Sequence, residues 1–197
     1  MSEEESHIDK IKTFLNEELN SKISINTGIN TALVFFIDEL NENLKLEIEE
    51  FGKDVRSFIL VSYVIVPSLT LELFRGIMLY FFSKNGINEQ MLLKGKWLPE
   101  TLLLKSKLCK DILVTQGHYF EKIVENKNYF EAIDFFCEEN NNVHRNKVAH
   151  NFCSSLEAVS RITLKDLEKN VNYIFEFLAG LIDVALSCSK KVTGSNN

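Results

Sequence analysis

The stretch FILVSYVIVPSLTL, Phe58–Leu71, contains no charged side chain and lies in a chain of 197 residues that is 45% hydrophobic. A membrane-spanning helix needs about 20 apolar residues, so this run is too short to cross a bilayer. It predicts instead a helix buried on most sides of a protein core. Pro67 lacks an N–H and crowds the carbonyl of Tyr63, which predicts a kink or break just before it.

The β-branched residues Val64, Ile65 and Val66 would also suit a strand. No second run of similar type is present in the sequence to pair with it, and a lone buried strand would leave its backbone groups without hydrogen bonds. The helical interpretation is therefore preferred.

The sequence on both sides of this run also has helical periodicity. Apolar residues recur at helical spacing from Ile29 to Ile59, as one long helix or two broken near Gly52, and Lys84-Asn85-Gly86 indicates a helix end. Thr163 predicts the start of a last helix that reaches about Ser187. Further helices are predicted at Pro99–Val114, around His118–Val124 and around Tyr129–Glu139, before a break at Asn140-Asn141-Asn142.

These elements predict an all-α fold, an up-down helical bundle with additional short helices. We expect an acidic N-terminal segment with a short helix over residues 1–28, the bundle over 29–188 and a disordered tail over 189–197. The first six residues have neither a basic region nor an apolar one, so no secretory signal is expected. The predicted location is the cytoplasm, with no membrane association.

The net charge of −6 is unfavourable for binding nucleic acid, but it is unevenly distributed. Residues 1–56 carry thirteen acidic and six basic side chains, whereas residues 84–110 carry six lysines and two glutamates. The second segment is either a basic strip or an ordinary solvated helix face.

Four scattered cysteines, Cys109, Cys137, Cys153 and Cys188, form no Cys-x-x-Cys pair and have no histidine at zinc-ligand spacing. We expect no metal site and no cofactor, and we expect reduced cysteines that are wholly or partly buried. Cys153 follows His150 by three residues and could be a thiol nucleophile, but packing is its expected role.

The segment RNKVAH, Arg145–His150, combines a fixed cation with a titratable imidazole. Arginine offers a planar fork of donors that fits phosphate oxygens, and histidine exchanges a proton near neutrality, so this pair can cleave a phosphodiester without a metal. The spacing alone is weakly specific, because a His would follow an Arg at one of three such spacings about 0.24 times by chance. The alternative is a helix cap or a surface ion pair with Glu138 or Glu139.

With polar Asn146 after the arginine and a long amphipathic segment following, Arg145–His150 resembles the Arg-x(4–6)-His motif of the HEPN superfamily (higher eukaryotes and prokaryotes nucleotide-binding). Members are small helical bundles, many of them ribonucleases of toxin and phage-defence systems. The resemblance implies a metal-independent endoribonuclease that acts on RNA as a homodimer, with an antitoxin or a nucleotidyltransferase as a further partner. It implies catalytic roles for Arg145, Asn146 and His150, and Lys147 and His144 are the predicted substrate-binding residues.

On a regular helix, Arg145 and His150 would point about 140° apart, because each residue turns about 100°. Either the helix ends inside the motif or a second copy completes the site, and the resemblance implies the second. Asn146 and His150 share a face, so the amide can orient the imidazole. In the implied mechanism His150 is the general base toward the ribose 2′-OH or the general acid toward the leaving 5′ oxygen, and Arg145 stabilises the phosphorane.

Two other hypotheses stay open. One is a non-catalytic HEPN module that binds a nucleotide or a partner protein, which the acidic net charge favours. The other is a structural helical protein in which the motif is accidental.

Overall fold

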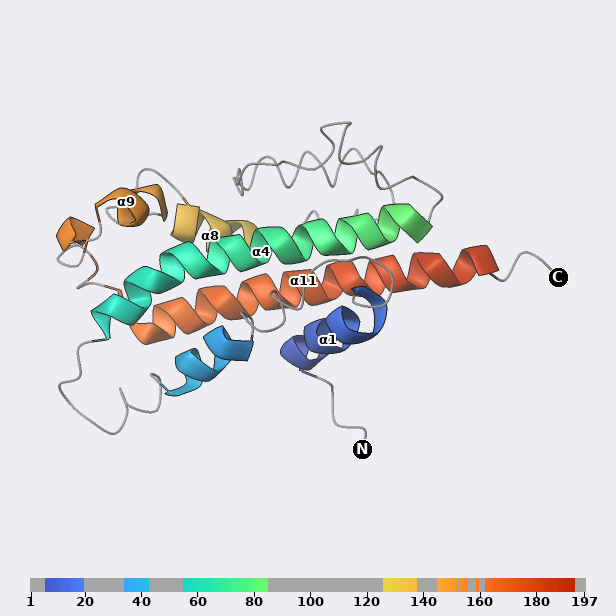
Figure 1. The fold of residues 1–197 in the computed structure, drawn as a ribbon, viewed down its shortest axis with the longest axis horizontal. Coiled ribbons are helices and arrows are strands. Elements are labelled where there is room, and N and C mark those ends of the chain that lie inside the picture. The colour runs from blue at the N-terminus through green and yellow to red at the C-terminus, as the bar shows by residue number, and fades with distance from the viewer. Residues whose placement is uncertain are drawn as a thin grey trace.

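The computed structural model describes residues 6–19, 34–42, 55–84, 126–137, 145–151, 153–155, 159 and 162–193. Every regular element in these ranges is helical, so the predicted all-α class is confirmed for them (Figure 1). The elements are α1 (His7–Phe14), the π-helical turn η1 (Leu15–Leu19), a helix over residues 34–42, α4 (Arg56–Lys84), α8 (Lys127–Cys137), α9 (Arg145–His150) and α11 (Leu164–Thr193).

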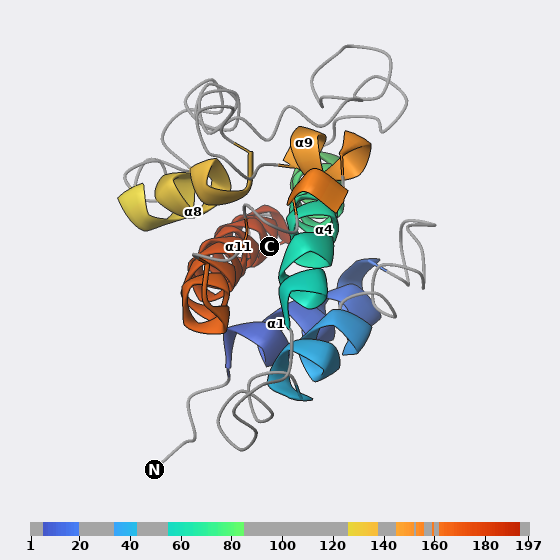
Figure 2. The same cartoon turned by 90° about the vertical axis from the view of Figure 1, so that its left-hand side faces the viewer.

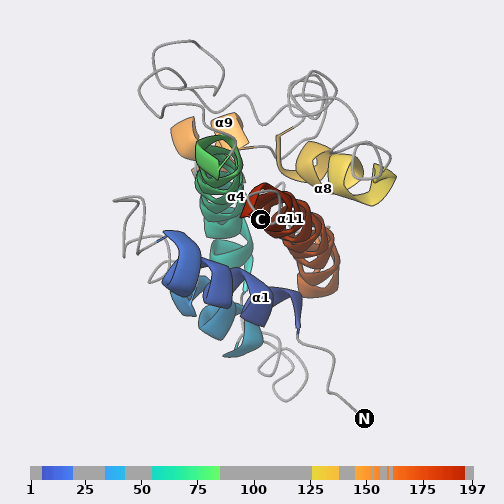
Figure 3. The same cartoon turned by 90° about the vertical axis from the view of Figure 1, so that its right-hand side faces the viewer.

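The two long helices, α4 and α11, pack side by side and run in the same direction (Figure 1). Seen along their length, they form a middle layer, with α1 and the 34–42 helix on one side and α8 and α9 on the other (Figures 2 and 3). On that second side α8 packs mainly against α11, whereas α9 packs mainly against α4. The described helices therefore form three layers, with the α4–α11 pair as the middle one.

The up-down order of the predicted bundle concerns helices that follow one another along the chain. Helices α4 and α11 are separated by residues 85–163, so their parallel course does not test that order. The helices predicted at Pro99–Val114 and around His118–Val124, and the basic residues 85–110, lie outside the described residues. The up-down arrangement therefore stays a prediction.

Helix α4 contains the whole uncharged run and confirms the helical interpretation over the strand. It is apolar on nearly all sides rather than along one stripe, which is typical of a helix in a core. By length and composition Arg56–Met78 could cross a membrane, but 61% of its apolar stretch is buried against the rest of the protein. The core helix of a soluble protein can have the same length and composition, so one such helix is weak evidence for a membrane span. The last described residue of α4 is Lys84, and the Asn85-Gly86 pair that predicts its end lies outside the described residues.

Of the kink or break expected just before Pro67, the break is not present, because α4 is helical from Arg56 to Lys84. Hydroxyl groups near the proline bond back to carbonyls one turn earlier: Ser68 Oγ donates to Val64 O at 2.8 Å and Thr70 Oγ1 donates to Val66 O at 2.7 Å. Apolar packing on both sides of Pro67 holds the helix together despite the lost N–H.

Helix α11 begins with a capping box, which confirms the predicted start. The backbone N–H of Asp166 donates to Thr163 Oγ1 at 3.1 Å, and the backbone N–H of Thr163 donates to Asp166 Oδ2 at 3.0 Å. The helix continues to Thr193, past the predicted end near Ser187, so residues 189–193 are helical where a disordered tail was expected.

Aromatic side chains fill the core between the layers. Tyr129 of α8 stacks on Phe177 of α11 with ring centroids 3.5 Å apart, and on the opposite side of the pair Phe14 of α1 meets Tyr80 of α4 edge-on at 5.2 Å. Helix α8 confirms the helix predicted around Tyr129–Glu139 and places Tyr129 in the core. These contacts fix both outer layers against α4 and α11.

Candidate functional site

The Arg145–His150 segment is one uninterrupted helix, α9. Of the two possibilities left open by the sequence, a helix end inside the motif is therefore excluded. Hydrogen bonds of helical spacing continue past His150. The Asn151 N–H donates to Lys147 O at 2.7 Å, and the Ser155 N–H donates to Asn151 O at 3.1 Å.

A buried side chain in the middle of α9 anchors it to the protein. Val148 is 1% exposed and belongs to the same core as α4. Ser155 is 0% exposed and its hydroxyl donates to Asn151 O at 2.9 Å, so it provides a second buried point on the segment that follows. The motif is thus held on the body of the protein by Val148 within it and by Ser155 in the segment that follows.

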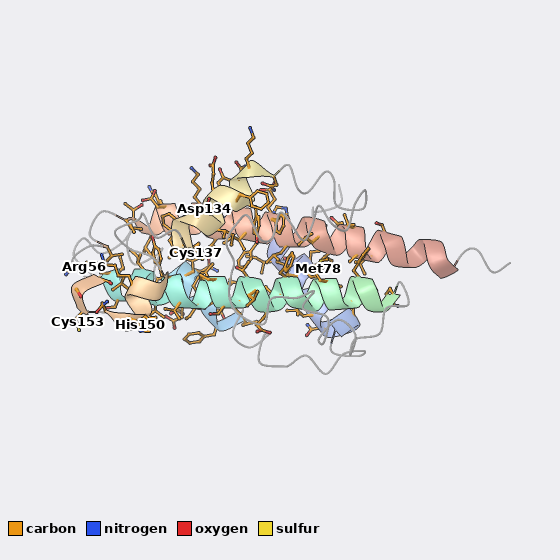
Figure 4. All side chains as sticks on the ribbon, turned by 90° about the horizontal axis from the view of Figure 1, so that it is seen from above. Arg56, Met78, Asp134, Cys137, His150 and Cys153 are labelled. Atoms are coloured by element: carbon orange, nitrogen blue, oxygen red, sulfur yellow. The ribbon has the colours of Figure 1, made fainter. Side chains whose placement is uncertain are left out.

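His150 is exposed, as are its neighbours Ala149 and Asn151. Positions that are two residues apart on a helix differ by about 200° of rotation, which is about 160° measured the shorter way around. Position 150 therefore lies nearly opposite the buried Val148 position. Figure 4 places His150 beside α4, near the end where that helix begins. The imidazole can therefore meet a large substrate from solvent.

The other predicted site residues are placed only in part. Position 145 lies about 60° from Val148 around the helix axis, whereas position 146 lies about 160° from Val148 and shares the face of His150. The side chains of Arg145 and Asn146 lie outside the described residues, and so does His144 as a whole. Lys147 is half-buried.

The cysteine nearest the motif differs from the expectation. Cys153 is a free thiol and is exposed, so its expected packing role is wrong, whereas Cys137 is free and half-buried as expected. The reason lies in the turn over residues 153–155, which turns Ser155 inward and leaves Cys153 outward. Cys109 and the side chain of Cys188 lie outside the described residues.

A cation that the sequence analysis did not single out lies at the same end of the protein. Arg56 is the first residue of α4 and is exposed. In Figure 4 it lies with His150 and Cys153 at one end of the molecule, and Figure 2 views this end directly, with α9 above the starts of α4 and α11. Its sequence signal is an arginine two residues before the apolar run Phe58–Leu71.

Two stretches of the sequence, around Arg56 and around α9, contain basic residues and no acidic ones although the chain is acidic. Residues 55–71 contain Arg56 and no Asp or Glu, and residues 140–156 contain Arg145 and Lys147 and no Asp or Glu. Asp166 lies at the start of α11, but its carboxylate accepts hydrogen bonds from the backbone and hydroxyl of Thr163. Both stretches are flanked directly by acidic residues, Asp54 and Glu72 for the first and Glu139 and Glu157 for the second, so the excess of basic residues is confined to short stretches of sequence.

Tyr63 of α4 lies in the core beneath this end. Its ring contacts Phe136 of α8 with centroids 5.2 Å apart, and it is 1% exposed. Burial, and to a lesser degree the negative charge of Asp166, raise the pKa of its hydroxyl above the usual 10.0. Its hydroxyl stays protonated at neutral pH and serves no acid–base role there.

Within the described residues no group of three or more His, Cys, Asp or Glu side chains could hold a metal ion. In comparisons with known proteins, no family model, curated protein or solved structure matches the chain. The resemblance to HEPN proteins therefore rests on the residues of the motif.

Proposed function

We propose that the chain is a metal-independent endoribonuclease whose chemistry is carried by the α9 segment. The observation that supports this most is the combination, on one short helix, of the buried anchor Val148 and the exposed His150. An imidazole on an anchored helix can reach the backbone of a macromolecular substrate in a fixed position. A histidine that only filled the core would be buried instead.

In the proposed reaction His150 removes the proton of a ribose 2′-OH, and the oxygen attacks the adjacent phosphorus. The bond from phosphorus to the 5′ oxygen breaks, a protonated imidazole supplies the proton to that oxygen, and the products are a 2′,3′-cyclic phosphate and a 5′-OH. Arg145 stabilises the negative charge on the phosphorane oxygens. Asn146 orients the imidazole from the same helix face.

Two copies of the chain are needed in this proposal. Because α9 is continuous, positions 145 and 150 are about 140° apart around its axis, so one copy does not aim both groups at one phosphate. A two-fold contact between the α9 segments of two copies would bring Arg145 of one copy to His150 of the other. Light scattering tests the dimer, and a monomer at micromolar concentration would contradict it.

Mixing two inactive variants tests the shared site more sharply. An Arg145→Ala copy paired with a His150→Ala copy retains one intact site if the site is shared, so an equimolar mixture should recover about a quarter of the wild-type activity. No recovery from subunits that exchange freely would show that Arg145 and His150 act within one copy.

The reaction itself is tested by the product and by chelation. Cleavage of RNA by the purified chain should persist in EDTA and yield 2′,3′-cyclic phosphate ends. Activity that disappears with EDTA and returns with magnesium would contradict the mechanism. Nucleotide or protein binding without cleavage would favour a non-catalytic HEPN module, which the net charge of −6 supports.

A further inference from the structure

Exposed apolar surface is concentrated where α4 meets the helix over residues 34–42. Within the described residues the large apolar side chains that are exposed are Val34, Phe35 and Val61. Val61 of α4 is 40% exposed and Phe35 of the preceding helix is 59% exposed. The ring of Phe36 stacks on that of Phe58 with centroids 6.0 Å apart, which brings Phe35 close to the turn of α4 that carries Val61.

On α4, Val61 belongs to a stripe of positions that reach the surface. Val61, Ile65 and Ser68, the outer stripe of α4, are exposed or half-buried and lie within about 60° of one another around the helix axis. Val61 lies about 160° from Tyr63, whose ring contacts Phe135 of α8 at 5.4 Å, so the outer stripe faces away from α8. In Figures 2 and 3 the side of α4 away from α11 has no described helix on it.

The charge pattern of the outer stripe fits a second copy of the chain. A net charge of −6 repels one copy from another, so two copies meet most easily where charge is absent. A two-fold contact sets each residue near its own copy, and a charged residue would then face its like. The run Phe58–Leu71 contains no charged side chain, so two outer stripes can bury their apolar surface without that repulsion.

The outer stripe also lies beside the segment that carries the proposed site. Helix α9 packs mainly against α4, and Figure 4 places His150 beside α4 on the side away from α11. A two-fold axis on this side, directed from α4 toward α9, sets the two α4 helices antiparallel and the two α9 segments next to each other. The proposed site needs this arrangement, because one copy holds positions 145 and 150 about 140° apart.

We propose that the outer stripe of α4, extended by Phe35, is the surface through which two copies of the chain associate. The two α4 helices cross in antiparallel directions, with Val61 of one copy near Val61 of the other. This inference rests on the proposed function, which requires a second copy, and it names the surface that the second copy covers.

Val61→Lys tests this surface by light scattering over a range of protein concentrations. Two lysines would face each other in the dimer, which should raise its dissociation constant at least about 100-fold. Phe35→Glu, at an exposed position of the other helix, should also weaken the dimer. Asn172→Lys adds the same positive charge at an exposed position of α11 and should leave the dimer intact. Far-ultraviolet circular dichroism should show the helix content of the wild type in all three variants.

A mixture of two variants shows whether position 61 meets its own copy. Val61→Lys and Val61→Glu should each be monomeric alone, and an equimolar mixture should form a dimer because opposite charges now meet. The mixture should also regain RNA cleavage. Variants that stay apart when they are mixed would overturn the proposed contact.

The remaining outcomes separate this inference from the proposed function. A wild-type dimer that Val61→Lys and Phe35→Glu leave intact would overturn the surface and leave the shared site standing. A monomeric Val61→Lys protein that cleaves RNA at the wild-type rate would support the surface and overturn the shared site. A wild-type monomer at micromolar concentration would overturn both, and its sedimentation with phosphatidylcholine vesicles would assign the outer stripe to a lipid surface instead.

Discussion

Val148 and His150 are two residues apart on α9, and the first is 1% exposed whereas the second is exposed. The helix turns about 200° between them, so one short segment both anchors itself in the core and presents an imidazole to solvent. Anchoring and chemistry thus depend on different side chains of the same segment. Substitutions at the two positions should have separable effects.

Val148→Ala should destabilise the protein. The change removes two buried methyl groups and leaves a cavity against α4, which should lower the free energy of unfolding by about 2 kcal/mol. Urea unfolding followed by circular dichroism measures it. Ala149→Ser, at the exposed neighbouring position, is the control and should stay within about 0.5 kcal/mol of wild type. Equal stability of the two variants would show that α9 is not anchored by Val148.

Tyr63→Phe should change how stability depends on pH. Burial raises the pKa of Tyr63 above 10.0, so below that pH the folded and unfolded chains both keep the proton. As pH rises past 10.0 the unfolded chain loses the proton while the folded chain retains it, and the free energy of unfolding falls. The Tyr63→Phe variant has no hydroxyl proton at this position, so its free energy of unfolding does not fall for this reason. The free energies of unfolding of wild type and variant should therefore differ by a constant amount near neutral pH. Above pH 10.0 the variant should become more stable relative to wild type.

The measurement for Tyr63→Phe is urea unfolding of both proteins at matched pH values on either side of 10.0. Removal of this one hydroxyl should change stability at neutral pH by about 1 kcal/mol. Parallel curves throughout the alkaline range would contradict the buried, protonated hydroxyl.

Gly180→Ala should stabilise the protein. Gly180 lies in the interior of α11, and a Cβ atom there would meet nothing within 4 Å. Alanine in place of glycine in a helix typically contributes about 0.5–1 kcal/mol. Asn172→Gly, at an exposed position of the same helix, should have the opposite effect and serves as the control. A lower melting temperature for Gly180→Ala would mean that the glycine is required by contacts along this helix.

Much of the helical framework could be predicted because it follows from local patterns. The apolar run at Phe58–Leu71, the capping residues Thr163 and Asp166 and the aromatic segment at Tyr129 each specify a helix within a few turns of sequence. The continuous helix through Pro67 could not be predicted, because packing from other layers overrides the local preference for a break. The packing of α4 beside α11 likewise depends on contacts between segments far apart in the chain.

The sequence predicts which residues form the candidate site. It does not predict which of them are exposed to solvent, because that depends on the fold. The sequence places Arg145 and His150 five residues apart, but only the buried state of Val148 and Ser155 shows which side of the segment faces solvent. Cys153 is exposed for the same reason, against expectation. Arg56 has no motif around it, so its place at the same end of the molecule as His150 emerges only from the fold.

Arg145→Ala should lower RNA cleavage by on the order of 10², the size typical of losing a charge stabiliser. Asn146→Ala should lie between this variant and wild type, because it only frees the imidazole to rotate. Single-turnover cleavage rates measure both, with melting temperatures as the check on folding. If Arg145 only caps a helix or forms a surface ion pair, the variants should show the reverse pattern, with reduced stability and no change in cleavage.

The rate of RNA cleavage by His150→Ala, measured in EDTA beside wild type and the exposed control Ala149→Ser, tests the central claim most directly. We expect wild type and Ala149→Ser to cleave at similar rates and His150→Ala to be slower by on the order of 10² or more. The melting temperature of His150→Ala should hardly move, because an exposed side chain contributes little to packing. Cleavage by His150→Ala at the wild-type rate would contradict the ribonuclease assignment.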